Sequence, residues 1–176
     1  IKYDYEHLII DNNSTDGTVA KIRKLSENDK NLKIILNARN YGHIRSPFYA
    51  LLQTNSDATI LMSSDFQDPV ELIEEYIEKW KNGKKIVLGQ KISSEENKIK
   101  YSIRTLFYNF LNKISEFELP KNTTGSGIFD KSIIDKLKKI NDPYPYFRGL
   151  ITELGEEITT IQFRQPLRKS GITKNN

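Results

Sequence analysis

The sequence predicts an α/β domain in which a mostly parallel central sheet is flanked by helices. Short apolar runs alternate with amphipathic segments along the first half of the chain, which is the pattern of parallel strands joined by helices. With 176 residues, 37% of them hydrophobic, the chain can also enclose one core of ordinary domain size. We therefore expect residues 1–176 to form a single domain.

The first half of the chain supplies most of the expected sheet. The expected strands are His7–Ile10, Leu32–Leu36, Ala58–Met62 and Lys85–Leu88, and the expected helices between them are Thr18–Leu25, Ile44–Gln53 and Val70–Lys81. The last helix has the strongest pattern, since its apolar residues recur at three- and four-residue spacing. Asp68 and Pro69 are expected to provide its N-cap and first-turn proline, and Asn82-Gly83 its end.

The second half is expected to add helices and one further strand. An amphipathic helix is predicted from Ile99 to Ile114, with apolar residues on one face and basic residues on the other. It could rest on a membrane surface, but a core helix with an exposed basic face fits the pattern better. The other expected elements are a loop at Glu118–Asn122, a glycine-containing loop at Asn122–Gly127, a helix at Ser132–Ile140, a rigid turn at Asp142–Tyr146, a helix at Arg148–Leu154 and a strand at Ile158–Phe163.

Composition excludes several kinds of protein and site. The 27 basic and 23 acidic residues leave a formal charge of +4, too small and too evenly spread to indicate a nucleic-acid partner, but compatible with a cytoplasmic location near anionic lipid. Without cysteine, disulfides and thiolate metal sites are excluded, and oxygen ligands favour Mg²⁺ or Mn²⁺. His7 and His43 are too isolated to suggest a metal site. Apolar runs stay far below the roughly 20 residues of a membrane-spanning helix, so we expect no bilayer crossing within this chain.

The first polar constellation is Asp11–Thr18, directly after the strand predicted at His7–Ile10. In an open parallel sheet, ligands bind beyond the carboxyl ends of the strands. The carboxylate of Asp11 could accept hydrogen bonds from a base or ribose, and the start of the next helix favours anions. An equally good interpretation is that Ser14 or Thr15 caps that helix and the rest is a turn.

The second constellation is Ser63–Pro69, at the carboxyl end of the strand predicted at Ala58–Met62. A Mg²⁺ or Mn²⁺ ion that bridges a diphosphate needs only one or two protein carboxylates, because phosphate oxygens and water complete its coordination. Asp65 is therefore a candidate metal ligand. Asp68 carries less weight, because a helix N-cap before proline explains it.

Two weaker signals follow later in the chain. The loop expected at Asn122–Gly127 contains glycines that permit close approach of backbone to a ligand. The basic tail contains Arg164, Arg168, Lys169 and Lys174, and arginine can hold diphosphate oxygens in a bidentate fork. Taken alone, such a tail is usually only solvated.

Taken in this order, these segments resemble the family 2 glycosyltransferases, and within them the dolichol-phosphate mannose synthase-like and polyprenyl-phosphate glycosyltransferase branch. The matching segments are Asp11–Thr18 (Asp-Asp-Gly-Ser-Thr-Asp-Gly-Thr in the family), Asp65–Pro69 (Asp-Leu-Gln-Asp-Pro), Tyr146–Gly149 and Arg168–Lys174 (Arg-x-x-Gly-x-Ser-Lys). The resemblance covers nearly the whole chain. It implies a GT-A type nucleotide-binding fold and a nucleoside diphosphate sugar as donor.

The resemblance also implies roles for individual residues. Asp65 is implied as a catalytic residue and metal ligand, and together with the substrate-binding residue Gln67 it would hold the metal ion and the phosphates or sugar of the donor. Arg168 is the other implied catalytic residue, and it would close over the diphosphate with Lys174. Asp11 would contact the nucleoside. The remaining residues implied in substrate binding are Asn12, Asn40, Gly42, Asp68, Lys91 and Arg148.

The sequence departs from the family pattern in three places. Ser63 replaces the first aspartate of the family's Asp-x-Asp, which leaves Asp65 as the main expected protein ligand. The strand and Pro-x-Tyr-Asn-Glu loop that usually open the fold have no counterpart, and neither do the membrane helices that often follow the final lysine. The natural protein is therefore expected to continue beyond this chain.

The reaction that the resemblance implies is sugar transfer with inversion at the anomeric carbon. The donor would be a UDP- or GDP-sugar, and the acceptor a polyprenyl phosphate or a glycan of a cell-surface polysaccharide. Such an acceptor implies possible peripheral contact with the cytoplasmic face of a membrane. The alternative is a nucleotide-sugar-binding module without turnover, which Ser63 and the missing strand favour. A nucleotidyltransferase would need a glycine-rich phosphate loop near the N-terminus, and none is present.

Overall fold

Strands and helices alternate through the first half of the chain in the computed structural model, which describes residues 3–92, 122–140 and 142–166. The strands are β1 (His7–Asp11), β2 (Leu32–Leu36), β3 (Ala58–Leu61), β4 (Ile86–Lys91), β5 (Thr123–Asp130) and β6 (Ile158–Phe163). The helices are α1 (Thr18–Asn28), α2 (Gly42–Gln53), α3 (Leu72–Lys81), α5 (Lys131–Ile140) and α6 (Phe147–Glu153). The predicted α/β class is confirmed.

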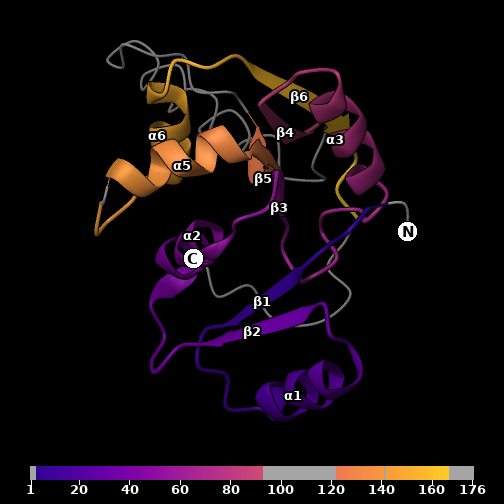
Figure 1. Ribbon diagram of the computed structural model, residues 1–176, viewed down its shortest axis with the longest axis vertical. Helices are drawn as coiled ribbons and strands as arrows, with labels where there is room; N and C mark the ends of the chain where they lie inside the picture. Colours follow the sequence, from indigo (N-terminus) through magenta and orange to yellow (C-terminus); the bar gives the residue numbers. More distant parts are fainter. Residues whose placement is uncertain (1–2, 93–121, 141, 167–176) are drawn as a thin grey trace, which may run out of the picture.

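The strands form two sheets that α2 connects (Figure 1). β1 and β2 pair in parallel, with Asp11 opposite Leu36. The other sheet has the order β3-β5-β4-β6, in which β4 and β6 are parallel and β5 runs antiparallel to both of its neighbours. α2 contacts both β1 and β3, so it packs across the junction between the sheets.

The alternation of apolar side chains along β4 divides the core into two clusters. Ile86 and Leu88 point to one face of the sheet and pack with residues of α2, α5 and α6. Val87 points to the other face and packs with Leu72 and Tyr76 of α3. Because both faces of β4 are covered, its first residues form the continuous apolar run that the sequence displays.

The prediction of a loop at Asn122–Gly127 is wrong, because from Thr123 onward this segment is the start of strand β5. One of its glycines, Gly127, lets two strands come close together. A Cβ atom on Gly127 would lie 2.2 Å from the carbonyl oxygen of Val87, so only glycine allows β5 to approach β4 this closely.

The other predicted elements are found with small shifts of their ends. Strands β2 and β6 match the predicted ranges, whereas α3 begins at Leu72 and not at Val70. The helix predicted at Ile99–Ile114 and most of the loop predicted at Glu118–Asn122 lie outside the described residues. Among the helices of the described ranges, none has both the length and the hydropathy needed to cross a membrane.

Candidate functional site

Asp11 ends β1 and is almost fully buried. Its Oδ1 accepts a hydrogen bond from the backbone N–H of Ser14 at 2.9 Å, and its carbonyl accepts from the backbone N–H of Asn37 at 3.0 Å. The carboxylate therefore organises the turn that follows the strand. Neither Ser14 nor Thr15 caps α1, since Gly17 occupies the N-cap position without a side-chain cap.

Asp16 supports the start of α1. Its Oδ1 accepts from the hydroxyl of Thr18 at 2.6 Å and from the backbone N–H of Thr18 at 3.2 Å. These bonds from the Thr18 side chain and backbone hold the pKa of the exposed Asp16 carboxyl below its ordinary value. The carboxylate thus stays charged just before the N-cap residue Gly17, near the helix end where the helix dipole favours a negative group.

Asn12 joins the end of β1 to the segment that leads into α2. Its Nδ2 donates to Oδ1 of Asn40 at 2.7 Å and to the carbonyl of Gly42 at 3.2 Å. Its Oδ1 accepts from Nδ2 of Asn37 at 3.1 Å and from the backbone N–H of Tyr41 at 2.9 Å. Because an amide side chain has two N–H donors and an acceptor oxygen with two lone pairs, these contacts use its full capacity. Asn12 therefore orients this segment, and its contact with substrate stays a prediction.

Asp65 lies in the loop that follows β3 and is partly exposed. Its Oδ1 accepts from the hydroxyl of Ser63 at 3.0 Å and from the backbone N–H of Gln67 at 3.2 Å. Between them, Phe66 has a φ of 59°, which is unusual for a bulky residue, and its side chain is exposed. Such strained positions are often found at functional sites.

Asp68 is not the N-cap that the sequence predicts. The cap position of α3 is occupied by Glu71, which makes no side-chain cap, and Pro69 lies before the helix. The buried Oδ2 of Asp68 instead accepts from the hydroxyl of Ser63 at 2.8 Å and from the hydroxyl of Ser126 in β5. The partners of this carboxylate are therefore two serine hydroxyls, one in the loop after β3 and one in β5, and not the N–H groups of the helix.

The structure places Arg148 and Lys91 in separate elements beside β5. Arg148 is in α6, and its Nε lies 3.9 Å from the position that a Cβ on Gly125 would occupy. Lys91 ends β4, and its backbone N–H donates to the carbonyl of Asn122 at 3.0 Å. Arg168 and Lys174 lie outside the described residues.

The predicted residues thus form two local groups. Asp11, Asn12, Asn40 and Gly42 gather around the ends of β1 and β2, and hydrogen bonds link the last three of them. Asp65, Gln67 and Asp68 form the second group in the loop after β3, where Ser63 contacts both aspartates.

A metal ion held by protein side chains alone does not fit this site. Within residues 3–92, 122–140 and 142–166, no three His, Cys, Asp or Glu side chains form a group that could hold one. A Mg²⁺ or Mn²⁺ ion that takes most of its ligands from phosphate and water needs only one or two carboxylates. Asp65, partly exposed and flanked by Gln67, fits that smaller donor set.

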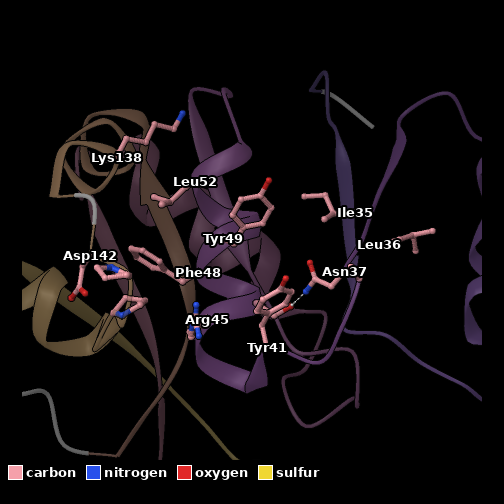
Figure 2. Close-up of a pocket in the computed structure, with 14 residues that line it drawn as sticks. Ile35, Leu36, Asn37, Tyr41, Arg45, Phe48, Tyr49, Leu52, Lys138 and Asp142 are labelled. Atoms are coloured by element: carbon pink, nitrogen blue, oxygen red, sulfur yellow. Dashed lines mark hydrogen bonds between the residues drawn. The ribbon is translucent and has the colours of Figure 1, made fainter.

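Sequence reasoning missed a pocket of about 490 Å³ between the end of β2, α2 and the turn before α6 (Figure 2). Asn37, which bonds Asn12, lines it and donates to the hydroxyl of Ser46 at 3.0 Å. The guanidinium carbon of Arg45 lies 5.7 Å from the ring centre of Tyr41 and 4.8 Å from that of Tyr144. The walls come from segments far apart in the sequence, so no local pattern signals this pocket.

Comparison with known proteins adds to this geometry. The model of the family described as "Glycosyl transferase family 2" matches residues 1–138. The chain is 30% identical over 174 residues to the uncharacterized glycosyltransferase YkcC of Bacillus subtilis (strain 168), covering 98% of this chain and 54% of that protein. It is 27% identical over 175 residues to the bactoprenol glucosyl transferase of Shigella phage SfX, covering 99% and 57%. The chain therefore spans about half the length of these curated relatives.

Proposed function

Because this chain belongs to glycosyl transferase family 2, we propose that it is the sugar-transferring part of an enzyme that moves a hexose from a UDP- or GDP-sugar to a polyprenyl phosphate. Support for this acceptor comes from relatives named bactoprenol glucosyl transferases, which match nearly all of this chain. The observation that carries the proposal is the half-buried carboxylate of Asp65, held at the end of β3 by Ser63 and Gln67.

Asp65 is the proposed protein ligand of a Mg²⁺ or Mn²⁺ ion, with Gln67 beside it. The ion, when bound, neutralises charge on the donor diphosphate and on the leaving group. The protein's part is to hold the carboxylate in one orientation, and the hydrogen bond from the backbone N–H of Gln67 does this before any ligand arrives, with the Ser63 hydroxyl beside the same oxygen.

The ends of β1 and β2 are the proposed nucleoside site. Asp11 is buried and held by Ser14, so its carboxylate presents a fixed acceptor to a base or ribose. The Asn12 network fixes the neighbouring segment through Asn40 and Gly42. Preorganised groups of this kind lose little conformational entropy when a ligand binds.

The proposed reaction is a direct displacement. A phosphate oxygen of the acceptor forms a bond to the anomeric carbon of the sugar while the bond from that carbon to the diphosphate breaks. The nucleoside diphosphate leaves with the bonding electron pair, and the anomeric configuration is inverted. A lipid phosphate is already largely ionised at neutral pH, so the chain needs no general base for this acceptor. A lipid acceptor also requires contact with a membrane surface.

Asp65→Asn tests this proposal, and Asp57→Asn is the matched control because Asp57 is an exposed aspartate just before β3. The assay measures release of UDP or GDP from UDP-glucose and GDP-mannose with Mn²⁺, with and without undecaprenyl phosphate. We expect release that depends on the lipid phosphate, a loss on the order of 100-fold in Asp65→Asn, and no change in Asp57→Asn. Full activity of Asp65→Asn would overturn the role of this carboxylate.

A second candidate function is a nucleotide-sugar-binding module without turnover. It is favoured by Ser63, which stands where the family pattern has a carboxylate, and by the lack of a metal-binding acidic cluster in the described ranges. A module would bind UDP or GDP, measured as a rise in melting temperature, but would release no diphosphate from either sugar donor with or without the lipid.

A further inference from the structure

Asp68 is a buried carboxylate that makes hydrogen bonds through only one of its oxygens. Its side chain lies between the loop after β3 and strand β5, and the residue is 3% exposed. Oδ2 accepts from the backbone N–H of Ser63 at 3.3 Å, from the hydroxyl of Ser63 at 2.8 Å and from the hydroxyl of Ser126. Oδ1 is buried and has no hydrogen-bond partner among the described residues.

This arrangement is costly for the fold. A buried carboxylate with one unsatisfied oxygen loses hydration that the protein does not replace. The hydroxyl of Tyr76, also fully buried, lacks a partner within the described ranges as well. Burial, followed by the charge of Asp68, raises the pKa of Tyr76 above its ordinary value, so the two groups interact unfavourably when both are charged. Asp68 does not cap α3, so helix capping does not explain a carboxylate here.

The hydroxyl of Ser63 connects this buried carboxylate to the proposed cation ligand. Its oxygen lies 2.8 Å from Oδ2 of Asp68 and 3.0 Å from Oδ1 of Asp65. A hydroxyl carries one proton, so it donates to only one of them at a time. Asp68 is the better acceptor, because it is nearer and its burial leaves the attraction less screened by water.

With the proton directed at Asp68, the lone pairs of the Ser63 oxygen face Oδ1 of Asp65. Two oxygens at 3.0 Å without a proton between them repel each other unless a positive charge lies beside both. Neighbouring ligand oxygens of an octahedral Mg²⁺ with bonds of about 2.1 Å lie about 3.0 Å apart. The separation found here therefore also fits two neighbouring ligands of one ion.

We propose that Asp68 is a positioning residue that holds the proton of the Ser63 hydroxyl, so that the Ser63 oxygen joins Asp65 as a neutral second ligand of a divalent cation. Ser126 fixes Asp68 from strand β5. The inference rests on the proposed function, since it refines the cation site at Asp65. It also explains how the chain works with serine in place of the family's first aspartate: the hydroxyl supplies an oxygen ligand without a second exposed charge.

Mn²⁺ affinity, measured by electron paramagnetic resonance with UDP and separately with GDP, tests this proposal without an activity assay. We expect Ser63→Ala and Asp68→Asn each to weaken Mn²⁺ binding about 10-fold or more. Ser63→Thr keeps the hydroxyl and should bind Mn²⁺ like the wild type, as should the control Asp57→Asn. Melting temperatures measured in parallel separate loss of the site from loss of the fold.

The double variant Ser63→Ala/Asp68→Asn distinguishes positioning from a merely structural role. If Asp68 acts through Ser63, the double variant binds Mn²⁺ as weakly as Ser63→Ala alone. Wild-type affinity in Ser63→Ala, together with loss of binding in Asp65→Asn, would overturn this inference and leave the proposed cation site standing. Absence of Mn²⁺ binding in the wild type with both nucleotides would overturn both. If Asp68→Asn does not fold, the contrast between Ser63→Ala and Ser63→Thr still decides the ligand role.

Discussion

Trp80, the only tryptophan of the sequence, donates its indole N–H to Oδ2 of Asp130 at 2.9 Å and so ties α3 to the end of β5. Oδ1 of Asp130 accepts from the backbone N–H of Ser132 at 2.9 Å and from its hydroxyl at 2.6 Å. Partial burial raises the pKa of Asp130, but the bonds from Ser132 and Trp80 outweigh it and hold this pKa below its ordinary value. One carboxylate thus fixes α3 and the start of α5.

Asp130→Ala should destabilise the fold by about 1–2 kcal/mol, because it removes the partner of Trp80 and of the first turn of α5. Urea unfolding followed by Trp80 fluorescence measures this. The folded-state pKa is depressed, so the carboxylate stabilises the fold above its unfolded pKa of about 3.9. This contribution is lost as pH falls through the folded pKa, so the difference between wild type and variant should shrink below about pH 4. An unchanged difference at pH 3 would contradict the assignment, and Asp57→Ala is the control.

Gly127→Ala should destabilise the fold by about 3 kcal/mol or more, because the new Cβ would lie 2.2 Å from the carbonyl of Val87 in the neighbouring strand. Gly17→Ala is the control, since no atom lies within 4 Å of a Cβ there and only its φ of 80° is unfavourable. That substitution should cost about 1–2 kcal/mol. Both values come from urea unfolding, and equal costs would mean that β4 and β5 do not approach as closely as described.

Local patterns predicted the elements whose apolar spacing is regular. The run Leu32–Leu36 and the segment Ile158–Phe163 became β2 and β6 with unchanged ends, because β-branched residues between turn signals determine a strand locally. The first part of β5 was missed for the opposite reason. Gly125 and Gly127 have no side chain to pack, and their place in a strand depends on the approach of β4 far earlier in the chain.

For the candidate site, as for the helices and strands, the sequence predicted the local features and missed a long-range one. The positions of Asp11 at the end of β1 and of Asp65 after β3 follow from the strand pattern, because polar residues that interrupt an apolar run mark the end of a strand. The wrong role for Asp68 arose because an N-cap is a local interaction, whereas its partner Ser126 is 58 positions away. No spacing rule relates such residues, so a long-range hydrogen bond overrode the local preference.

Asn12→Ala should destabilise the protein by about 1–3 kcal/mol, because it leaves the polar groups of Asn37, Asn40 and Tyr41 without their common partner. Asn31→Ala is the matched control, since the Asn31 side chain is exposed and has no hydrogen bond in the described part of the chain. Hydrogen exchange of the Tyr41 backbone amide reports the effect locally. We expect faster exchange there in Asn12→Ala, and a protected Tyr41 amide would contradict the role of Asn12 as the support of this segment.

Tyr76→Phe should leave stability at pH 7 unchanged or raise it by about 1 kcal/mol, because the hydroxyl it removes is buried and has no partner among the described residues. The difference in stability between Tyr76→Phe and the wild type should grow at alkaline pH. Burial, followed by the charges of Asp68 and Glu75, raises the pKa of Tyr76 above the usual value near 10.0. The folded wild type therefore loses stability as pH rises above about 10, because the unfolded chain ionises first.

Urea unfolding of wild type and Tyr76→Phe between pH 8 and pH 11 separates this tyrosine from the others, which both proteins share. The wild type should lose more stability than the variant above about pH 10. Below that pH, the free energies of unfolding of the two proteins should change with pH in parallel. Parallel curves up to pH 11 would mean that water reaches the hydroxyl in the folded state. Tyr5→Phe, at an exposed tyrosine, is the control and should follow the wild type throughout, because it keeps the buried phenol of Tyr76.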